Sequence, residues 1–170
     1  MNRITKYTVS KFDGTLPATG TPGEDEAWMA GELKKSLAAI SEHYENMEFR
    51  KAAAETRALW ATGNEYLTRA EPWVKYKNDV DAAAVGVRTG LNLVAIFAII
   101  AQPLIPSTAK TILDTLGVPD GNRNWPNPDQ AEEVLDALPH GMPIAAPPVL
   151  FQKIEDDMVA EWTEKFGGES

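Results

Sequence analysis

The sequence contains no cysteine and only two histidines, His43 and His140, which lie far apart. Disulfides and thiolate metal sites are therefore excluded, and without a second imidazole at ligand spacing we expect no metal site. The same scarcity removes the residue types from which nucleophile, base and acid sets are built. A Gly-x-x-x-x-Gly-Lys phosphate loop is also missing. These residues alone predict a binding or interaction module and no catalytic residues.

Long apolar runs are scarce as well. Met1 to Lys6 contains no apolar stretch of the kind that a signal peptide needs. The most apolar run, Leu91 to Ile105, carries Asn92, Gln102 and Pro103 and is too short to span a bilayer. We therefore expect a soluble, cytoplasmic chain with no membrane partner.

Positive charge is in deficit, since the formal net charge is −9. That balance argues at first against a nucleic-acid partner. The distribution of the charge weakens this objection, because the acidity lies mostly in the C-terminal part. Residues 120–170 hold 11 acids and 3 bases, whereas residues 1–119 hold 14 acids and 13 bases. Arg3, Lys6 and Lys11 make the first eleven residues locally basic.

What the chain does have is helical periodicity. At 170 residues and 44% hydrophobic content it is long enough for one domain with a core. Apolar residues at i, i+3, i+4, i+7 spacing, with proline and glycine punctuation, predict helices over Glu24–Tyr44, Phe49–Leu67, Val80–Ala101, Pro106–Leu116, Gln130–Leu138 and Asp156–Phe166. The helix over Val80–Ala101 is apolar nearly all round in its second half, which is typical of the most buried helix.

Proline density changes at residue 118. Seven of the twelve prolines lie between Val118 and Pro148, which indicates an extended segment that wraps the bundle. The sequence therefore predicts a single all-α domain over 1–170, with a helical core over 1–117, a Pro-rich wrapping segment over 118–153 and a C-terminal helix over 154–170.

Two charged features have structural interpretations. Arg88 lies in a mostly apolar helix and needs a partner if it is buried, so we expect an ion pair. The cluster Glu155-Asp156-Asp157 has the residue types of a hard-cation site. Negative charge at the start of the last helix is the favoured interpretation.

The stretch from Gly63 to Lys77 is the most informative in the chain. A helix runs into it, Pro72 breaks that helix, and Trp73 follows with two lysines within four residues. Proline suits the first turn of a new helix, so Trp73 is expected at a helix junction. A flat ring beside cations can serve as a platform for an unpaired base. The alternative is a core aromatic that pins two helices together.

Four motifs follow one another over nearly the whole chain. They are Arg3 through Phe12-Asp13-Gly14, Gly63-Asn64-Glu65-Tyr66 with Glu71-Pro72-Trp73, Arg88-Thr89-Gly90-Leu91 through Gln102-Pro103-Leu104-Ile105-Pro106, and Val149-Leu150-Phe151-Gln152-Lys153-Ile154-Glu155-Asp156. Together they resemble the C-terminal anticodon-binding domain of bacterial methionyl-tRNA synthetase, a class I synthetase. Asn-x-Tyr followed by Pro-Trp also fits related class I enzymes, and the closing motif resembles the methionyl branch.

The resemblance implies a site. Trp73 matches the tryptophan that stacks on the first anticodon base, a cytosine of CAU, and Pro72 matches the proline that sets the position of this ring. Arg3 matches the arginine of the first helix that reaches the anticodon bases and backbone. Asn64 is added as a supporting polar group, because it lies shortly before the Pro-Trp junction.

The departures from the family indicate a partial chain. Neither the His-x-Gly-His type signature nor the Lys-Met-Ser-Lys-Ser type loop of the catalytic domain occurs here. The family's domain also begins about one turn earlier, where an asparagine joins in anticodon reading. Met1 is therefore interpreted as an added start residue and Asn2 as the helix N-cap. A naturally free-standing domain is the alternative.

Two functions remain open from the sequence. The first is recognition of the methionine tRNA anticodon by a monomeric domain that needs no cofactor, while the ATP and magnesium of the parent enzyme belong to its catalytic domain. The partners implied are methionine tRNA and that catalytic domain. The second is a helical protein-interaction module without RNA binding. Only the first expects Trp73 to be largely exposed beside Arg3.

Overall fold

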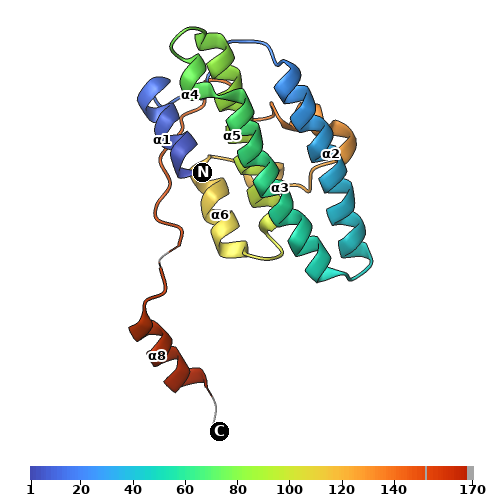
Figure 1. The fold of residues 1–170 in the computed structure, drawn as a ribbon, viewed down its shortest axis with the longest axis vertical. Coiled ribbons are helices and arrows are strands. Elements are labelled where there is room, and N and C mark those ends of the chain that lie inside the picture. Colours follow the sequence, from blue (N-terminus) through green and yellow to red (C-terminus); the bar gives the residue numbers. More distant parts are fainter. Residues whose placement is uncertain (152, 168–170) are drawn as a thin grey trace.

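The computed structural model describes residues 1–151 and 153–167 and shows a bundle of α-helices (Figure 1). Two short 3-10 turns, η1 (Asp120–Asn122) and η2 (Pro128–Gln130), interrupt the later part of the chain. The α-helices are α1 (Asn2–Lys11), α2 (Glu24–Glu45), α3 (Phe49–Ala70), α4 (Pro72–Lys75), α5 (Val80–Ala101), α6 (Pro106–Thr115), α7 (Ala131–Val134) and α8 (Asp156–Phe166). The all-α class predicted from the sequence is confirmed. Gln152 of the closing motif and residues 168–170 of the predicted C-terminal part lie outside the described residues.

Helix ends follow the local chemistry of the sequence. Three acidic residues open α2, where carboxylates face the positive end of the helix dipole, and Gly23 N–H donates to Glu26 Oε2 at 2.7 Å. Asp79 caps α5 by accepting from Ala82 N–H at 2.9 Å. Gly117 follows α6 with φ +65°, the left-handed conformation expected of a helix C-cap glycine. The carboxylates of Asp156 and Asp157 stand in the first turn of α8, as predicted.

Helix α5 is the centre of the bundle, in contact with α1, α3, α4 and α6. Its length and composition would suffice to cross a membrane, although the shorter run Leu91–Ile105 would not. The helix begins at Val80, so its span includes apolar residues upstream of that run. Because 89% of its most apolar window is buried inside the bundle, α5 has the environment of a core helix.

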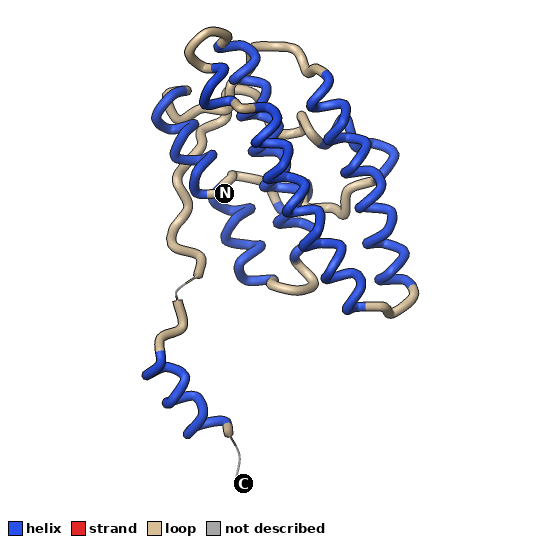
Figure 2. Tube along the Cα trace, viewed as in Figure 1, coloured by secondary structure: helices blue, strands red, loops and turns tan. Residues whose placement is uncertain are grey.

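The core consists of two apolar clusters that share α5. One joins α2, α3 and α5 to Ala131 and Leu135. The other joins α1, α5 and α6 to Leu16, which follows α1, and to Leu138 and Ile144, which follow α7. Figure 2 shows how the long connections after α6 run along the helices. The segment after residue 118 therefore contributes side chains to both clusters.

The helix predicted over Gln130–Leu138 is shorter in the structure. Its α-helical part is α7, Ala131–Val134, which follows directly on η2. Leu138 N–H donates to the buried Asn92 side chain at 2.9 Å, so the backbone group that would continue the helix is used in a tertiary bond. The division of the chain into parts at residues 117 and 153 stays a prediction.

Two further expectations have opposite outcomes. Arg88 is 2% exposed and its Nε donates to Asp136 Oδ1 at 2.6 Å, which confirms the predicted ion pair. The predicted N-cap at Asn2 is wrong, because Asn2 is already the first residue of α1 and Met1 precedes it without a side-chain capping bond. The main-chain oxygen of Met1 instead accepts the first helical bonds, from Ile4 and Thr5 N–H.

Candidate functional site

The junction between α3 and α4 has the geometry predicted for it. Helix α3 ends at Ala70, Glu71 adopts a left-handed conformation with φ 42° and ψ 49°, and Pro72 is the first residue of α4. A residue before proline is disfavoured in the right-handed helical region, which explains why the break falls at Glu71. A non-glycine residue at positive φ is uncommon and is often found at functional sites.

Pro72 packs the start of α4 against α5. Its ring is buried against α5, where a Cβ added to Gly86 would lie 3.3 Å from Pro72 Cβ. The Tyr7 hydroxyl of α1 lies 3.5 Å from the Pro72 carbonyl oxygen, to which it donates. Burial, together with the nearby Tyr76, raises the pKa of Tyr7, so this hydroxyl stays protonated near neutral pH. Pro72 therefore positions the next residue, Trp73, between α1 and α3.

Trp73 lies directly beside Arg3. The guanidinium carbon of Arg3 is 3.9 Å from the centroid of the Trp73 ring, within cation–π range. Tyr7 meets the indole edge-on, with ring centroids 5.6 Å apart and planes at 90°. Trp73 is partly buried rather than largely exposed. This difference from the expectation has a direct cause, since Arg3 and Tyr7 both pack on the ring.

A surface hollow of about 340 Å³ brings the predicted residues together. Arg3, Asn64 and Trp73 all line it, whereas Pro72 is buried and lies outside the lining. The remaining lining residues are Met1, Ile4, Leu67, Thr68 and Glu71. The hollow thus combines an aromatic ring, a guanidinium and a carboxamide, which are groups able to stack on a base and bond its edge.

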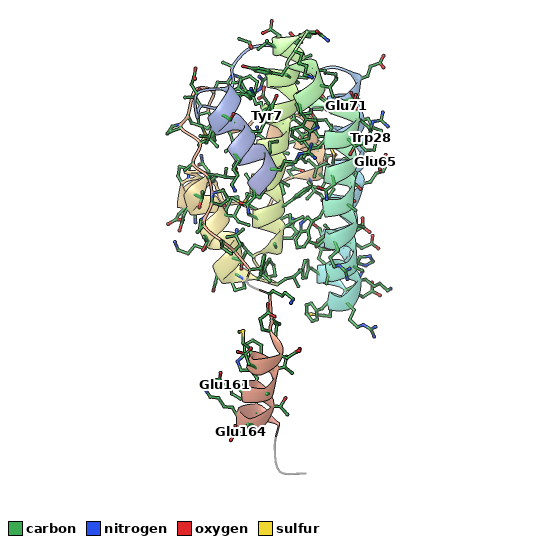
Figure 3. The ribbon with its side chains drawn as sticks, turned by 60° about the vertical axis from the view of Figure 1, so that its left-hand side comes forward. Tyr7, Trp28, Glu65, Glu71, Glu161 and Glu164 are labelled. Atoms are coloured by element: carbon green, nitrogen blue, oxygen red, sulfur yellow. The ribbon has the colours of Figure 1, made fainter. Side chains whose placement is uncertain are left out.

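Two charged side chains line the hollow, Arg3 and Glu71. Arg3 is exposed and forms no ion pair with any of the described residues. Glu71 is exposed as well, and Figure 3 shows it near the same end of the bundle as Tyr7. The described part of the chain contains no group of three or more histidine, aspartate or glutamate side chains placed to hold a metal ion.

Two residues of this site were not predicted from the sequence. Tyr7 contacts both Trp73 and the Pro72 carbonyl, and its position four residues after Arg3 was the available signal, because i and i+4 share a helix face. Glu71 could have been found from its place before Pro72, where the helix must end.

In fold, the chain is an all-α domain whose Pro-Trp junction forms a hollow lined by an aromatic ring, a guanidinium and a carboxamide. The family model for the anticodon-binding domain of methionyl-tRNA ligase matches residues 16–170. The chain belongs to that family. This result confirms the resemblance drawn from the four sequence motifs.

Curated relatives show where such a domain occurs. The methionine–tRNA ligase of Maricaulis maris (strain MCS10) is 71% identical over 168 residues, which is 99% of this chain and 29% of the relative. The corresponding ligase of Hyphomonas neptunium (strain ATCC 15444) is 65% identical over 171 residues, covering 99% of this chain and 30% of the relative. The chain therefore spans less than a third of the length of the relatives it matches.

Solved structures share the fold. The free-state Mycobacterium tuberculosis methionyl-tRNA synthetase superimposes with a TM-score of 0.76, covering 90% of this chain and 30% of that one at 20% sequence identity. The same enzyme bound by methionyl-adenylate gives a TM-score of 0.72 over 88% of this chain. These comparisons establish that the helices are arranged as in methionyl-tRNA synthetases.

Proposed function

We propose that this chain recognises the CAU anticodon of methionine tRNA. Within that proposal it is the tRNA-binding part of a cytoplasmic methionyl-tRNA synthetase, whose catalytic domain, with ATP and magnesium, lies in the rest of the parent enzyme. The observation that carries the proposal is the hollow in which Arg3, Asn64 and Trp73 meet, in a chain of the anticodon-binding family.

Trp73 and Arg3 have the chemistry that an unpaired base requires. The bases of an anticodon loop can be splayed out, stacked on an aromatic ring and bonded at their edges. In this structure the Arg3 guanidinium carbon lies 3.9 Å from the centroid of the Trp73 ring, on which a base would stack. In the complex the guanidinium moves aside to a base edge or a phosphate, both of which suit its fork of donors. Asn64 contributes a carboxamide within the same hollow.

The acidic net charge is compatible with this role. An anticodon contact needs few phosphate contacts when the remainder of the tRNA lies on the rest of the parent enzyme. The isolated chain is accordingly expected to bind weakly, because phosphate contacts supply much of the affinity for nucleic acids. In the parent enzyme, anticodon reading selects the tRNA whose acceptor end reaches the catalytic domain. That catalytic domain is the second partner of this chain, beside methionine tRNA.

The test is a titration of the chain with a methionine-tRNA anticodon stem-loop, beside a loop whose first anticodon cytosine is replaced by uracil. Wild-type protein should prefer the cytosine loop. Trp73→Ala should lose about 1–3 kcal/mol of binding, roughly 5- to 150-fold in affinity, together with the preference. Trp162→Ala is the matched control, since it removes a tryptophan from α8, where no side chain is buried.

The outcomes separate the two functions. Binding that is indifferent to the base and to Trp73→Ala would reflect electrostatic attraction alone and would refute anticodon reading. No binding by a folded wild-type chain would favour the protein-interaction module. Thermal unfolding of Trp73→Ala verifies that the variant retains the bundle.

A further inference from the structure

Unpaired cations are concentrated next to the Trp73 hollow. In the part of the chain that the structure describes, nine of the sixteen lysines and arginines form ion pairs with carboxylates. Four of the others lie on α1 or directly after α4, namely Arg3, Lys6, Lys11 and Lys77. Helix α1 itself contains no acidic residue. Helix α1 therefore carries positive charge that no ion pair among the described residues neutralises, while the Glu71 carboxylate lies at the hollow.

A second cation–aromatic pair stands beside the first. Lys11 Nζ lies 5.6 Å from the centroid of the Tyr76 ring, and the Tyr76 hydroxyl donates to the Lys11 carbonyl oxygen at 2.9 Å. The Tyr7 ring connects this pair to the Trp73 hollow, since its centroid is 5.6 Å from that of Trp73 and 6.2 Å from that of Tyr76. Arg3 on Trp73 and Lys11 on Tyr76 thus belong to one continuous aromatic cluster.

The spacing of residues along α1 determines how the two cation–aromatic pairs lie relative to each other. Arg3, Tyr7 and Lys11 are four residues apart, so they share one face of the helix. Eight residues at a rise of 1.5 Å separate Arg3 from Lys11 by about 12 Å along the axis. An RNA strand carries a phosphate on every nucleotide. A strand that places one base on Trp73 and continues along α1 therefore brings a neighbouring phosphate to Lys11.

We propose that Lys11 and Tyr76 form a second RNA subsite, which holds the phosphate of a nucleotide next to the base on Trp73. This inference rests on the proposed function, because it requires RNA at the Trp73 hollow. The Lys11 ammonium is a compact point charge that suits a phosphate. The Tyr76 ring, held by its hydroxyl bond and by Phe12 at a centroid distance of 5.4 Å, keeps that ammonium on the face shared with Arg3. The contact carries no base preference of its own.

The test compares Lys11→Gln with wild-type protein in titrations of the same anticodon stem-loop at several salt concentrations. Loss of one phosphate contact lowers the slope of log affinity against log salt by about 0.7 and weakens binding about fivefold near 0.1 M salt. The ratio of affinities for the cytosine and uracil loops should stay unchanged. Lys165→Gln is the matched control, because Lys165 Nζ also lies over a ring, 5.3 Å from the Phe166 centroid, on the remote helix α8.

Each outcome bears on the inference. Wild-type binding that depends on Trp73 but is unchanged in slope and affinity by Lys11→Gln would overturn the subsite and leave anticodon reading intact. Loss of base preference in Lys11→Gln would also overturn it, since Lys11 would then act by positioning Trp73. Absence of RNA binding by the wild-type chain would overturn both proposals. Lys11 is exposed, so the variant is expected to unfold at the wild-type temperature.

Discussion

Arg88 shows how one buried side chain can connect three parts of the chain. From α5 its Nε donates to Asp136 in the Pro-rich segment, and its Nη1 donates to the carbonyl oxygens of Pro17 and Thr19 at 3.2 and 2.8 Å. Those carbonyls belong to the connection between α1 and α2. A guanidinium suits this position because it presents several donors in one plane. A wholly apolar side chain there would leave the carbonyl oxygens without a donor.

Replacing Arg88 with methionine should destabilise the bundle by about 3 kcal/mol, because main-chain acceptors in the interior lose their donors and Asp136 loses its ion pair. Urea denaturation measures the change. Arg57→Met serves as the control, since Arg57 is exposed and should change stability by less than about 0.5 kcal/mol. A loss below about 1 kcal/mol for Arg88→Met would show that water or a shifted backbone replaces the guanidinium.

Among whole elements, those with a regular apolar stripe in their sequence were predictable and those without one were not. The bounds of α5 agree with the prediction, and α8 matches the helix predicted over Asp156–Phe166. Helix α1 shows no such stripe, because two of its three buried residues are threonines, Thr5 and Thr8. The Thr8 hydroxyl donates to the Ile4 carbonyl oxygen of its own helix at 2.9 Å, which allows a polar residue to be buried.

The same distinction applies to the candidate site. The Pro-Trp junction could be predicted, since proline and the residue before it restrict the backbone locally. Its surroundings could not, because the approach of α1 is a tertiary event. That approach brings Tyr7 to Trp73, and it places Lys11 over Tyr76. Arg3 was assigned to the site from the family resemblance and Asn64 from its place shortly before the junction, and the hollow brings them together across 61 residues of sequence.

The close packing of α1 against α5 depends on Gly90. A Cβ added there would clash with Ile4 Cδ1 and lie 3.0 Å from Leu67 Cδ2. Gly90→Ala should therefore destabilise the bundle by about 1–3 kcal/mol through overpacking. Gly31→Ala in α2 is the matched control, because no atom lies within 4 Å of its added Cβ.

At Gly31 the better helix propensity of alanine acts alone, so that variant should gain about 0.5–1 kcal/mol. Chemical denaturation of both variants beside the wild type provides the comparison. Equal changes in the two variants would contradict the close packing of α1 on α5. A destabilisation confined to Gly90→Ala would support it.

For the molecule as a whole, charge is divided between two regions. Residues 155–170 carry a net charge of −5 out of the total of −9, and α8 within them buries no side chain. Figure 1 shows α8 standing away from the bundle, and Figure 3 shows Glu161 and Glu164 along it. Helix α1 carries charge of the opposite sign, and its cations Arg3 and Lys11 lie over rings of the aromatic cluster. Under the proposed function, an approaching RNA is therefore repelled by one region and attracted by the other.

Deleting residues 155–170 should consequently leave the unfolding temperature of the bundle unchanged and strengthen binding of the anticodon stem-loop. The gain should be roughly two- to fivefold at 0.01 M salt and should vanish near 0.15 M, because the screening length falls from about 30 to about 8 Å. Glu161→Gln with Glu164→Gln keeps the helix and removes two of these charges, so this double variant should give part of the gain. Stronger binding that persists at 0.15 M salt would mean that α8 covers the RNA site by contact rather than repelling RNA through its charge.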